Sequence, residues 1–257
     1  MTSLDRWKGK VALVTGASSG IGQATARLLA DAGMRVAAAA RSLERLEALQ
    51  RAQQETSSPD QISGEILPIQ TDLRDENQIE ALFDHVRQKW GGVDVLINNA
   101  GLGYAGSLSD QSSTDWREML DVNVLALSRC TQEALKDMET CQEGYIIHIS
   151  SITAHTVIPS SNPFYGATKH AVRALSESLR QELVARKSPV RISSISPGLV
   201  ETEFSARSRR TPGFTANYQN FKVIQPEDIA QAVAYLLSTP HHIQVNDIIL
   251  RPRLQEN

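Results

Sequence analysis

Short apolar runs alternate along the chain with longer segments of helical periodicity. The short runs predict seven strands: Val11–Thr15, Arg35–Ala40, Ile66–Thr71, Val93–Asn98, Gly144–Ser150, Val190–Ser196 and Asp247–Leu250. The periodic segments predict helices near Gly20–Ala32, Leu43–Glu55, Glu76–Trp90, Thr114–Met138, Phe164–Arg186 and Pro226–Leu237. Strands and helices in alternation are typical of βαβ units, so we expect an α/β fold with a parallel sheet.

Several predicted strands are apolar on both faces, as expected for a sheet that helices cover on both sides. Connections are short except at Thr56–Gly64 and from Gly198 to about Val223, where turn residues occur without a clear strand. Long loops in compact domains often act as functional lids. No linker or repeat divides the chain, so we expect one domain over residues 1–257 with a substrate loop at about 198–223.

Composition narrows the function classes. The 257 residues are 41% apolar and 21% charged with a net charge of −3, which argues against a nucleic-acid partner. No apolar run approaches the roughly 20 residues that cross a membrane, and the start of the chain has no secretory apolar region. Cys130 and Cys141 lack metal-type spacing, as do the histidines. We therefore expect a cytoplasmic protein with reduced thiols and no metal.

A glycine-rich turn follows the first predicted strand. Gly16, Gly20 and Gly22 stand where a helix begins, and backbone N–H groups with the helix dipole favour a phosphate there. An ordinary βα connection can contain the same glycines, and the glycine spacing departs from the commonest dinucleotide-binding fingerprint. The position in the first βαβ unit favours the dinucleotide interpretation. The turn lacks the Gly-Lys-Ser/Thr ending of nucleotide-hydrolysing enzymes.

The end of the second strand bears on which dinucleotide binds. Enzymes that prefer NAD often carry an acid there for the ribose hydroxyl, whereas this chain has Ala40 and Arg41. An exposed arginine at a helix start is the competing interpretation. The missing acid and the present cation favour NADP, with NADPH preferred over NADH.

Tyr165 and Lys169 are four residues apart and share one face of a predicted helix. A tyrosine beside a carbonyl can supply the proton that carbonyl reduction needs, but its ordinary pKa of ~10 is too high for efficient exchange. Lowering that pKa to about 7 requires about 4 kcal/mol, which one lysine cation at ~4 Å supplies in an effective dielectric near 20. Taken alone, the spacing is better explained as a chance pair on a helix surface, because Tyr-x-x-x-Lys is common.

Polar residues at other predicted strand ends strengthen the interpretation that Tyr165 and Lys169 belong to an active site. Ser150 and Ser151 close the fifth strand, where hydroxyls of a parallel sheet face the ligand crevice. The fourth strand ends at Asn98–Gly101, where the small residues Ala100 and Gly101 allow a cofactor to pass close to the backbone. Asn123 lies inside an apolar helix and needs hydrogen-bond partners. Together these residues indicate a site at one edge of the sheet.

The set resembles the short-chain dehydrogenase/reductase family in its common single-domain form. The matching motifs are Thr15–Gly22, Asn98–Gly101, Asn123, Ser151, Tyr165 with Lys169, and Pro197–Thr202. The resemblance implies a doubly wound Rossmann fold with strand order 3-2-1-4-5-6-7. It also implies catalytic roles for Tyr165 as acid/base, Lys169 as its activator, Ser151 as holder of the substrate oxygen, and Asn123 as holder of a relay water.

The resemblance further implies which residues bind the cofactor. These are Gly16, Ser18, Ser19, Gly20, Ile21, Gly22, Arg41, Asp72, Leu73, Asn99, Ala100, Gly101, Tyr165, Lys169, Pro197, Gly198, Val200 and Thr202. One departure concerns the serine, which usually precedes the tyrosine by thirteen positions and here, at Ser151, by fourteen. Ser150 and Thr153 are the alternatives. We choose Ser151 because it stands at the strand end.

Within the family, the chain is similar to bacterial NADP-dependent 3-hydroxy acid (serine-type) dehydrogenases and to a cytosolic animal branch that reduces ketosteroids and dicarbonyls. The similarity is carried by Leu237–Pro252 and, for the animal branch, by Asp121–Ser128 and Arg180–Leu183. It implies an NADPH-dependent carbonyl reductase or alcohol dehydrogenase acting on a small molecule. A non-catalytic dinucleotide sensor of the same fold is the alternative.

Two further expectations concern surfaces. The long loop carries Arg207, Arg209 and Arg210 with Phe214, Tyr218 and Phe221, and one arginine could meet a substrate carboxylate; ordinary solvated charges are the favoured alternative. The helices Thr114–Met138 and Phe164–Arg186 carry apolar stripes beyond those that cover a sheet, and family members often pair them across a two-fold axis. We therefore expect a homodimer or homotetramer.

Overall fold

The computed structural model describes residues 3–56, 64–139, 143–157, 162–210 and 222–255. Its strands are β1 (Val11–Thr15), β2 (Arg35–Ala40), β3 (Glu65–Gln70), β4 (Val95–Asn98), β5 (Gly144–Ile149), β6 (Val190–Pro197) and β7 (Asp247–Leu250). Its α-helices are α1 (Gly20–Asp31), α2 (Leu43–Thr56), α3 (Glu76–Trp90), α4 (Ser113–Leu120), α5 (Leu127–Met138), α6 (Pro163–Ala185), α7 (Phe204–Ser208) and α8 (Pro226–Ser238). Three shorter helical turns are η1 (Asp5–Trp7), η2 (Asp121–Ala126) and η3 (Ile152–Ala154).

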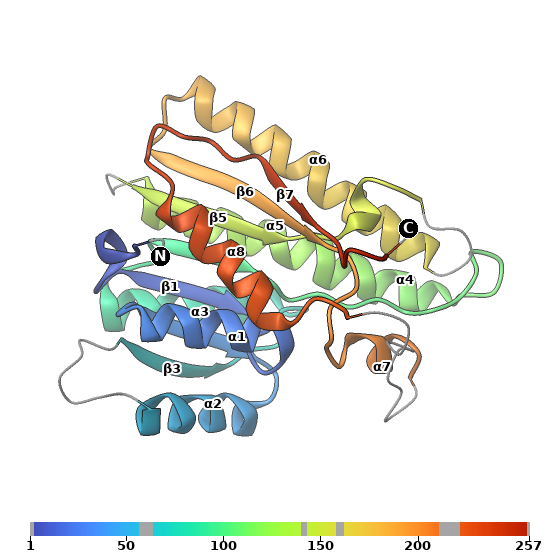
Figure 1. The fold of residues 1–257 in the computed structure, drawn as a ribbon, viewed down its shortest axis with the longest axis horizontal. Helices are drawn as coiled ribbons and strands as arrows, with labels where there is room; N and C mark the ends of the chain where they lie inside the picture. The colour runs from blue at the N-terminus through green and yellow to red at the C-terminus, as the bar shows by residue number, and fades with distance from the viewer. Residues whose placement is uncertain (1–2, 57–63, 140–142, 158–161, 211–221, 256–257) are drawn as a thin grey trace.

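The seven strands form one parallel sheet in the order β3-β2-β1-β4-β5-β6-β7. This confirms the expected α/β fold and strand order. All carboxyl ends therefore meet at one edge of the sheet, and Figure 1 shows α7 beyond that edge. The chain reverses its direction of winding after β3, and β1 and β4 become neighbours. In open α/β sheets, ligands bind in the crevice at this point.

Alternating strand residues feed two apolar cores, one on each face of the sheet. In β1, Ala12 and Val14 pack into the core under α1, α2 and α8, while Val11 and Leu13 pack into the core under α3, α5 and α6. Figure 1 shows the same layers, with α1 and α8 crossing in front of the sheet. Because helices cover both faces of the sheet, the strand sequences are continuous apolar runs. For this reason the strands could be predicted from the sequence.

Local signals place the helix ends. Asp75 caps α3 by accepting a bond from the backbone N–H of Asn77, and Gly91 ends the helix with a φ angle of 93°. Pro163 begins α6, and Pro226 begins α8 behind a capping box between Gln225 and Asp228.

Two predicted elements differ from the structure. The helix expected over Thr114–Met138 is instead α4 and α5 joined by η2, a turn of π-helix with wider hydrogen bonding. The loop expected over about 198–223 contains the short helix α7. Residues 211–221 of that loop, with Phe214, Tyr218 and Phe221, lie outside the described residues.

Candidate active site

The turn between β1 and α1 leaves no room for side chains at its glycines. A Cβ atom at Gly22 would lie 2.4 Å from the carbonyl oxygen of Gly16, and one at Gly16 would lie 2.9 Å from the Cα of Ala100. Gly16 and Gly20 have φ angles of 67° and 54°, which residues with side chains rarely adopt. The turn therefore presents main-chain groups without side chains at its three glycines. We call this turn, residues 16–22, the glycine cradle.

Asn99 and Ala100, just after β4, hold the cradle in place. The Nδ2 of Asn99 donates to the carbonyl oxygens of Thr15 and Gly16 at 2.8 and 3.2 Å. The Oγ1 of Thr15 accepts from the backbone N–H groups of Asn99 and Ala100 at 3.0 Å each. Ser19, the N-cap of α1, makes no side-chain cap bond to its helix. N–H groups at such a helix start favour an anion, so the cradle fits the pyrophosphate of a dinucleotide.

Two of the residues predicted to bind the cofactor, Arg41 and Asp72, follow β2 and β3. Arg41 is exposed after β2, directly beyond the buried Ala40. Asp72 follows β3, and a hydrogen bond from Arg74 lowers its pKa, with a smaller contribution from the charge of Arg41. Arg74 also bonds Glu118 of α4 at 2.7 Å. Sequence reasoning missed Arg74, because its second partner is 44 positions away and no local pattern links them.

Tyr165 and Lys169 lie on the first turns of α6, as the spacing predicted. Both are buried, with 9% and 4% of their surface exposed. The Nζ of Lys169 lies 5.7 Å from the centre of the Tyr165 ring and donates to the carbonyl oxygen of Ile149 at 2.9 Å. The lysine is therefore oriented by the end of β5, next to the tyrosine.

The electrostatic balance at this pair differs from the sequence-based estimate. Burial raises the pKa of Tyr165 to about 12, and a hydrogen bond with Ser151 opposes it. Burial lowers the pKa of Lys169 to about 8. Burial of the Tyr165 hydroxyl therefore opposes the lowering of its pKa that was expected from the lysine and the cofactor.

Ser151 starts η3 next to Tyr165, and the interaction of its hydroxyl with the phenol lowers the pKa of Tyr165 against the effect of burial. The Oγ of Ser151 accepts from the backbone N–H and the hydroxyl of Thr153, at 3.2 and 3.0 Å. The buried Ser150 Oγ has no hydrogen-bond partner among the described residues. The role of Ser151 stays a prediction, and Thr153 is its hydrogen-bond partner.

Asn123 lies in η2 with 1% of its surface exposed. Its Oδ1 accepts from the backbone N–H of Leu102 at 2.9 Å, and its Nδ2 donates to the Leu102 carbonyl and to Thr168 at 2.8 and 3.0 Å. A Cβ atom at Gly101 would lie 3.4 Å from Asn123 Oδ1 and 3.6 Å from Lys169 Nζ. Asn123, Gly101 and Lys169 therefore meet at one point, and the asparagine ties the segment after β4 to α6.

Two residues that sequence reasoning missed form a wall beside the tyrosine. The ring of Phe204 in α7 lies 5.5 Å from the ring of Tyr165. A Cβ atom at Gly103 would lie 3.0 Å from both rings, so this position admits no side chain without movement. Phe204 stands two residues past the Pro197–Thr202 motif, but only the chain path shows that it turns back to the tyrosine.

The segment Pro197–Thr202, which holds four of the residues predicted to bind the cofactor, leaves the end of β6. Pro197 ends the strand, and Val200 forms an isolated parallel bridge with Ile224. Thr202 lies so close to Gly20 that a Cβ atom there would be 2.9 Å from its Cγ2. The structure therefore brings this segment against the glycine cradle.

The loop arginines have partners within the chain. Arg207 bonds Glu203 and lies 3.4 Å from the Oγ of Ser19 in the cradle. Arg210 pairs with Asp115 and lies over the ring of Tyr104. Arg207 therefore faces the cradle. Arg207 and Arg210 therefore pair with carboxylates of the chain itself.

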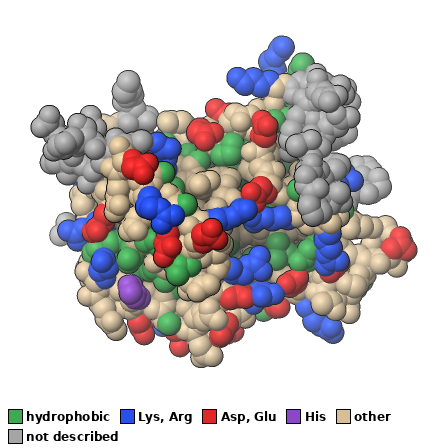
Figure 2. Space-filling view, turned by 90° about the horizontal axis from the view of Figure 1, so that it is seen from below, with side chains coloured by type: hydrophobic (Ala, Val, Ile, Leu, Met, Phe, Trp, Pro, Cys, Tyr) green, Lys and Arg blue, Asp and Glu red, His purple; other side chains and the backbone are tan. Residues whose placement is uncertain are grey.

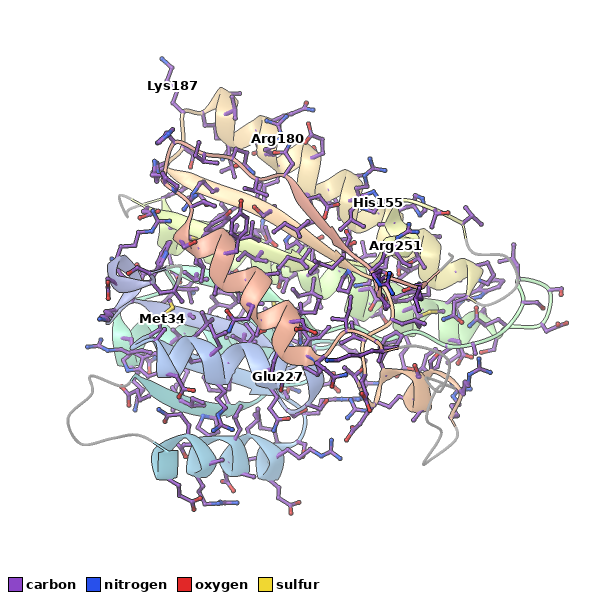
Figure 3. The ribbon with its side chains drawn as sticks, viewed as in Figure 1. Met34, His155, Arg180, Lys187, Glu227 and Arg251 are labelled. Atoms are coloured by element: carbon purple, nitrogen blue, oxygen red, sulfur yellow. The ribbon has the colours of Figure 1, made fainter. Side chains whose placement is uncertain are left out.

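A groove of about 640 Å³ extends from the cradle. Its first residues are Ser18, Ser19 and Gly20, and it continues between α1 and α2 to the start of α8. Glu227, labelled in Figure 3, is also one of its lining residues. Figure 2 shows basic and acidic side chains meeting across a hollow on the lower face of the molecule.

The described residues contain neither a cluster of metal ligands nor a membrane-spanning helix. No three His, Cys, Asp or Glu side chains in this part of the chain gather as metal ligands would. None of its helices is long and apolar enough to span a membrane. Cys130 is buried in α5, and Cys141 lies outside the described ranges.

Known proteins share this arrangement across nearly the whole chain. Dehydrogenase/reductase SDR family member 11 of Mus musculus is 44% identical over 257 residues, covering 98% of this chain and 97% of the relative. Farnesol dehydrogenase of Aedes aegypti is 42% identical over 253 residues, covering 97% and 98%. The closed form of a serine dehydrogenase complexed with NADP⁺ superposes with a TM-score of 0.86 at 32% identity, covering 96% of each chain.

The family comparison agrees with these matches. Residues 10–213 match the short chain dehydrogenase family, and this range holds the glycine cradle, Asn123, Ser151, Tyr165 and Lys169. The chain is therefore an oxidoreductase of the short-chain dehydrogenase/reductase family.

Proposed function

We propose that this protein is an NADPH-dependent carbonyl reductase that also oxidises the corresponding secondary alcohols. The observation that carries the proposal is the buried pair of Tyr165 and Lys169 on α6, at the same sheet edge as Ser151 and the glycine cradle. When bound, NADPH supplies the hydride that the carbonyl carbon receives.

The chain's own residues supply the proton and the orientation. Ser151 orients the carbonyl oxygen, and Tyr165 gives that oxygen its proton. The Tyr165 phenol, whose pKa burial raises to about 12, carries at neutral pH the proton that reduction consumes. A neighbouring cation favours the phenolate that is left when this proton is given up. Lys169 places a cation beside the ring of Tyr165. Asn123 holds the backbone of Leu102, so that the cofactor can approach the backbone at Gly101.

The decisive experiment is a carbonyl panel with NADPH, read by loss of its absorbance. The panel holds α-diketones, 3-oxo acids, ketosteroids, retinal, farnesal and simple aldehydes. Turnover of several members supports the proposal. Binding of NADPH without turnover of any member would support the alternative, a dinucleotide sensor of the same fold.

We expect Arg41→Ala to lower kcat/KM for NADPH about tenfold, equivalent to about 1.4 kcal/mol, and to leave NADH nearly unaffected. The reason is that an exposed arginine after β2, beyond the small Ala40, faces the 2′-phosphate that only NADPH carries. Arg35→Ala is the matched control, because Arg35 is exposed at the opposite end of the same strand. Equal losses for both cofactors, or a wild-type preference for NADH, would contradict the proposal.

We also propose that copies of the chain pair through the helices that carry the site. Leu125 in η2 and Val184 in α6 are 56% and 65% exposed, and Leu120 and Leu175 add to the same helices. Light scattering at micromolar protein should give the mass of a dimer or tetramer, and Leu125→Glu with Val184→Glu should lower it. A wild-type mass of one chain would reject the pairing.

A further inference from the structure

A small polar cluster lies behind the serine that contacts Tyr165. His155 Nε2 is 2.7 Å from Asp247 Oδ2 and 3.1 Å from Ser196 Oγ. The hydroxyl of Ser196 also donates to the two oxygens of Asp247 at 3.0 and 3.1 Å. Ser196 is fully buried, while the side chains of His155 and Asp247 are 16% and 21% exposed. None of the three belongs to the residues proposed above to touch substrate or cofactor.

The cluster joins three elements at the carboxyl edge of the sheet. His155 ends the turn η3, Ser196 lies near the end of β6, and Asp247 begins β7. Figure 3 shows His155 at this edge, between α6 and the ends of the strands. Because β6 and β7 are paired in the sheet, Ser196 and Asp247 form a rigid base for the imidazole.

The turn held by this base is the one that Ser151 starts. Ser151 is the N-cap of η3, and its Oγ accepts from the backbone N–H of Thr153. Within the turn, Ala154 N–H donates to the Ser151 carbonyl at 3.0 Å, and His155 N–H donates to the Ile152 carbonyl at 2.9 Å. A three-residue helical turn has few bonds of its own, so its direction depends on what holds its far end.

We propose that His155 is a positioning residue that, through Asp247 and Ser196, fixes η3 and thereby directs the Ser151 hydroxyl toward Tyr165. The inference rests on the proposed function, since Ser151 and Tyr165 are the groups that act on the carbonyl. A hydrogen bond to a carboxylate is stronger and shorter than one between neutral groups, which suits a clamp. The imidazole can hold Asp247 in either protonation state, because a neutral ring can still carry its proton on Nε2.

A double-mutant cycle separates positioning from general packing. With NADPH and diacetyl as the probe pair, His155→Ala should lower kcat about tenfold, and His155→Gln, which keeps a donor near the Nε2 position, should restore most of it. In a Ser151→Ala background, His155→Ala should cause no further loss, because the hydroxyl that it positions is gone. The dissociation constant of NADPH, measured by fluorescence, should stay unchanged throughout.

Two controls support the cycle. His85→Ala removes an exposed histidine of α3 and should leave kcat unchanged. Asp247→Asn removes the carboxylate charge without removing bulk and should reproduce the loss seen for His155→Ala. It also serves as the test if His155→Ala does not fold.

A second measurement needs no turnover. In NMR spectra of the chain with isotope-labelled tyrosine, the Tyr165 signal is assigned by its loss in Tyr165→Phe. His155→Ala should shift that signal in the same direction as Ser151→Ala does, because both remove the same hydrogen bond. This result stands even if no carbonyl in the panel is reduced, so failure of the proposed function is distinguishable from failure of the positioning role.

Two outcomes would overturn the inference. One is equal loss of kcat from His155→Ala in both serine backgrounds, which would mean that the histidine acts independently of Ser151. The other is a Tyr165 signal that moves in Ser151→Ala but not in His155→Ala or Asp247→Asn.

Discussion

Replacing Tyr165 by phenylalanine should lower kcat for carbonyl reduction by about a thousandfold, since a positioned acid contributes roughly 10²–10⁴ to such a step. The variant keeps the ring that packs 5.5 Å from Phe204 and fits against Gly103, and loses only the hydroxyl. Folding and NADPH binding should therefore stay close to wild type. Steady-state kinetics and a fluorescence titration of NADPH check the two halves of this expectation.

The neighbouring serines provide a matched comparison for the tyrosine. Ser151→Ala should lower kcat with little change in NADPH affinity, because the Ser151 hydroxyl lies beside Tyr165 and lowers the pKa of its phenol against the effect of burial. Ser150→Ala should leave kcat nearly unchanged, because the Ser150 hydroxyl is buried without a partner among the described residues. If Tyr165→Phe retains a tenth or more of wild-type kcat, or if Ser150→Ala is the damaging change, the proposed centre is misplaced.

Acid should weaken the fold through His148, by about 2 kcal/mol in the free energy of unfolding between about pH 7.5 and pH 5. His148 lies in β5 between two helices, with Nδ1 2.8 Å from Ser176 of α6 and Nε2 3.2 Å from Thr131 of α5. Burial lowers its pKa from 6.5 to about 3, and the charge of Lys169 adds to the effect. The ring is therefore neutral in the folded chain.

The sign of this effect follows from proton binding. The unfolded chain binds a proton at His148 below about pH 6.5, whereas the folded chain does so only near pH 3. The contribution of this histidine to stability is therefore intact above pH 6.5 and falls by about 1.4 kcal/mol per pH unit below it. Other groups titrate over the same range, so only a comparison of variants isolates this part.

Urea unfolding of the wild type, His148→Asn and His148→Gln at the two pH values makes that comparison. The amide side chains cannot take up a proton, so both variants should lose about 2 kcal/mol less than the wild type on acidification. His85→Asn, on the exposed face of α3, should lose as much as the wild type. Equal losses in all four proteins would show that His148 is not held neutral.

Most of the fold could be predicted because its strands are buried on both faces. The apolar runs gave every strand within two residues at either end, and the helices that cover them carry capping residues or prolines at their starts. The π turn η2 was missed because its residues continue the same apolar stripe as the helices on either side. The five residues of α7 are too few to show a helical period.

The site was predictable where its chemistry follows local spacing, as for Tyr165 and Lys169 four residues apart on one helix. Ser151 and Ser150 could not be separated by counting, because the choice depends on where β5 ends and η3 begins. Phe204 was missed because it reaches the tyrosine from another part of the chain. The pKa of Tyr165 was misjudged because burial, which spacing does not reveal, dominates it.

The π turn in front of α5 sets a condition on how this chain can change and remain active. Such a turn holds one residue more than a regular helical turn, and each residue rotates a helix by about 100°. With the extra residue, Asn123 faces Leu102 and Thr168 while Cys130 and Met138 face the core. Deleting any one residue between 121 and 126 would force a choice between those two orientations. We therefore expect side chains in η2 to be replaceable at several positions, whereas the number of residues in η2 has to stay the same.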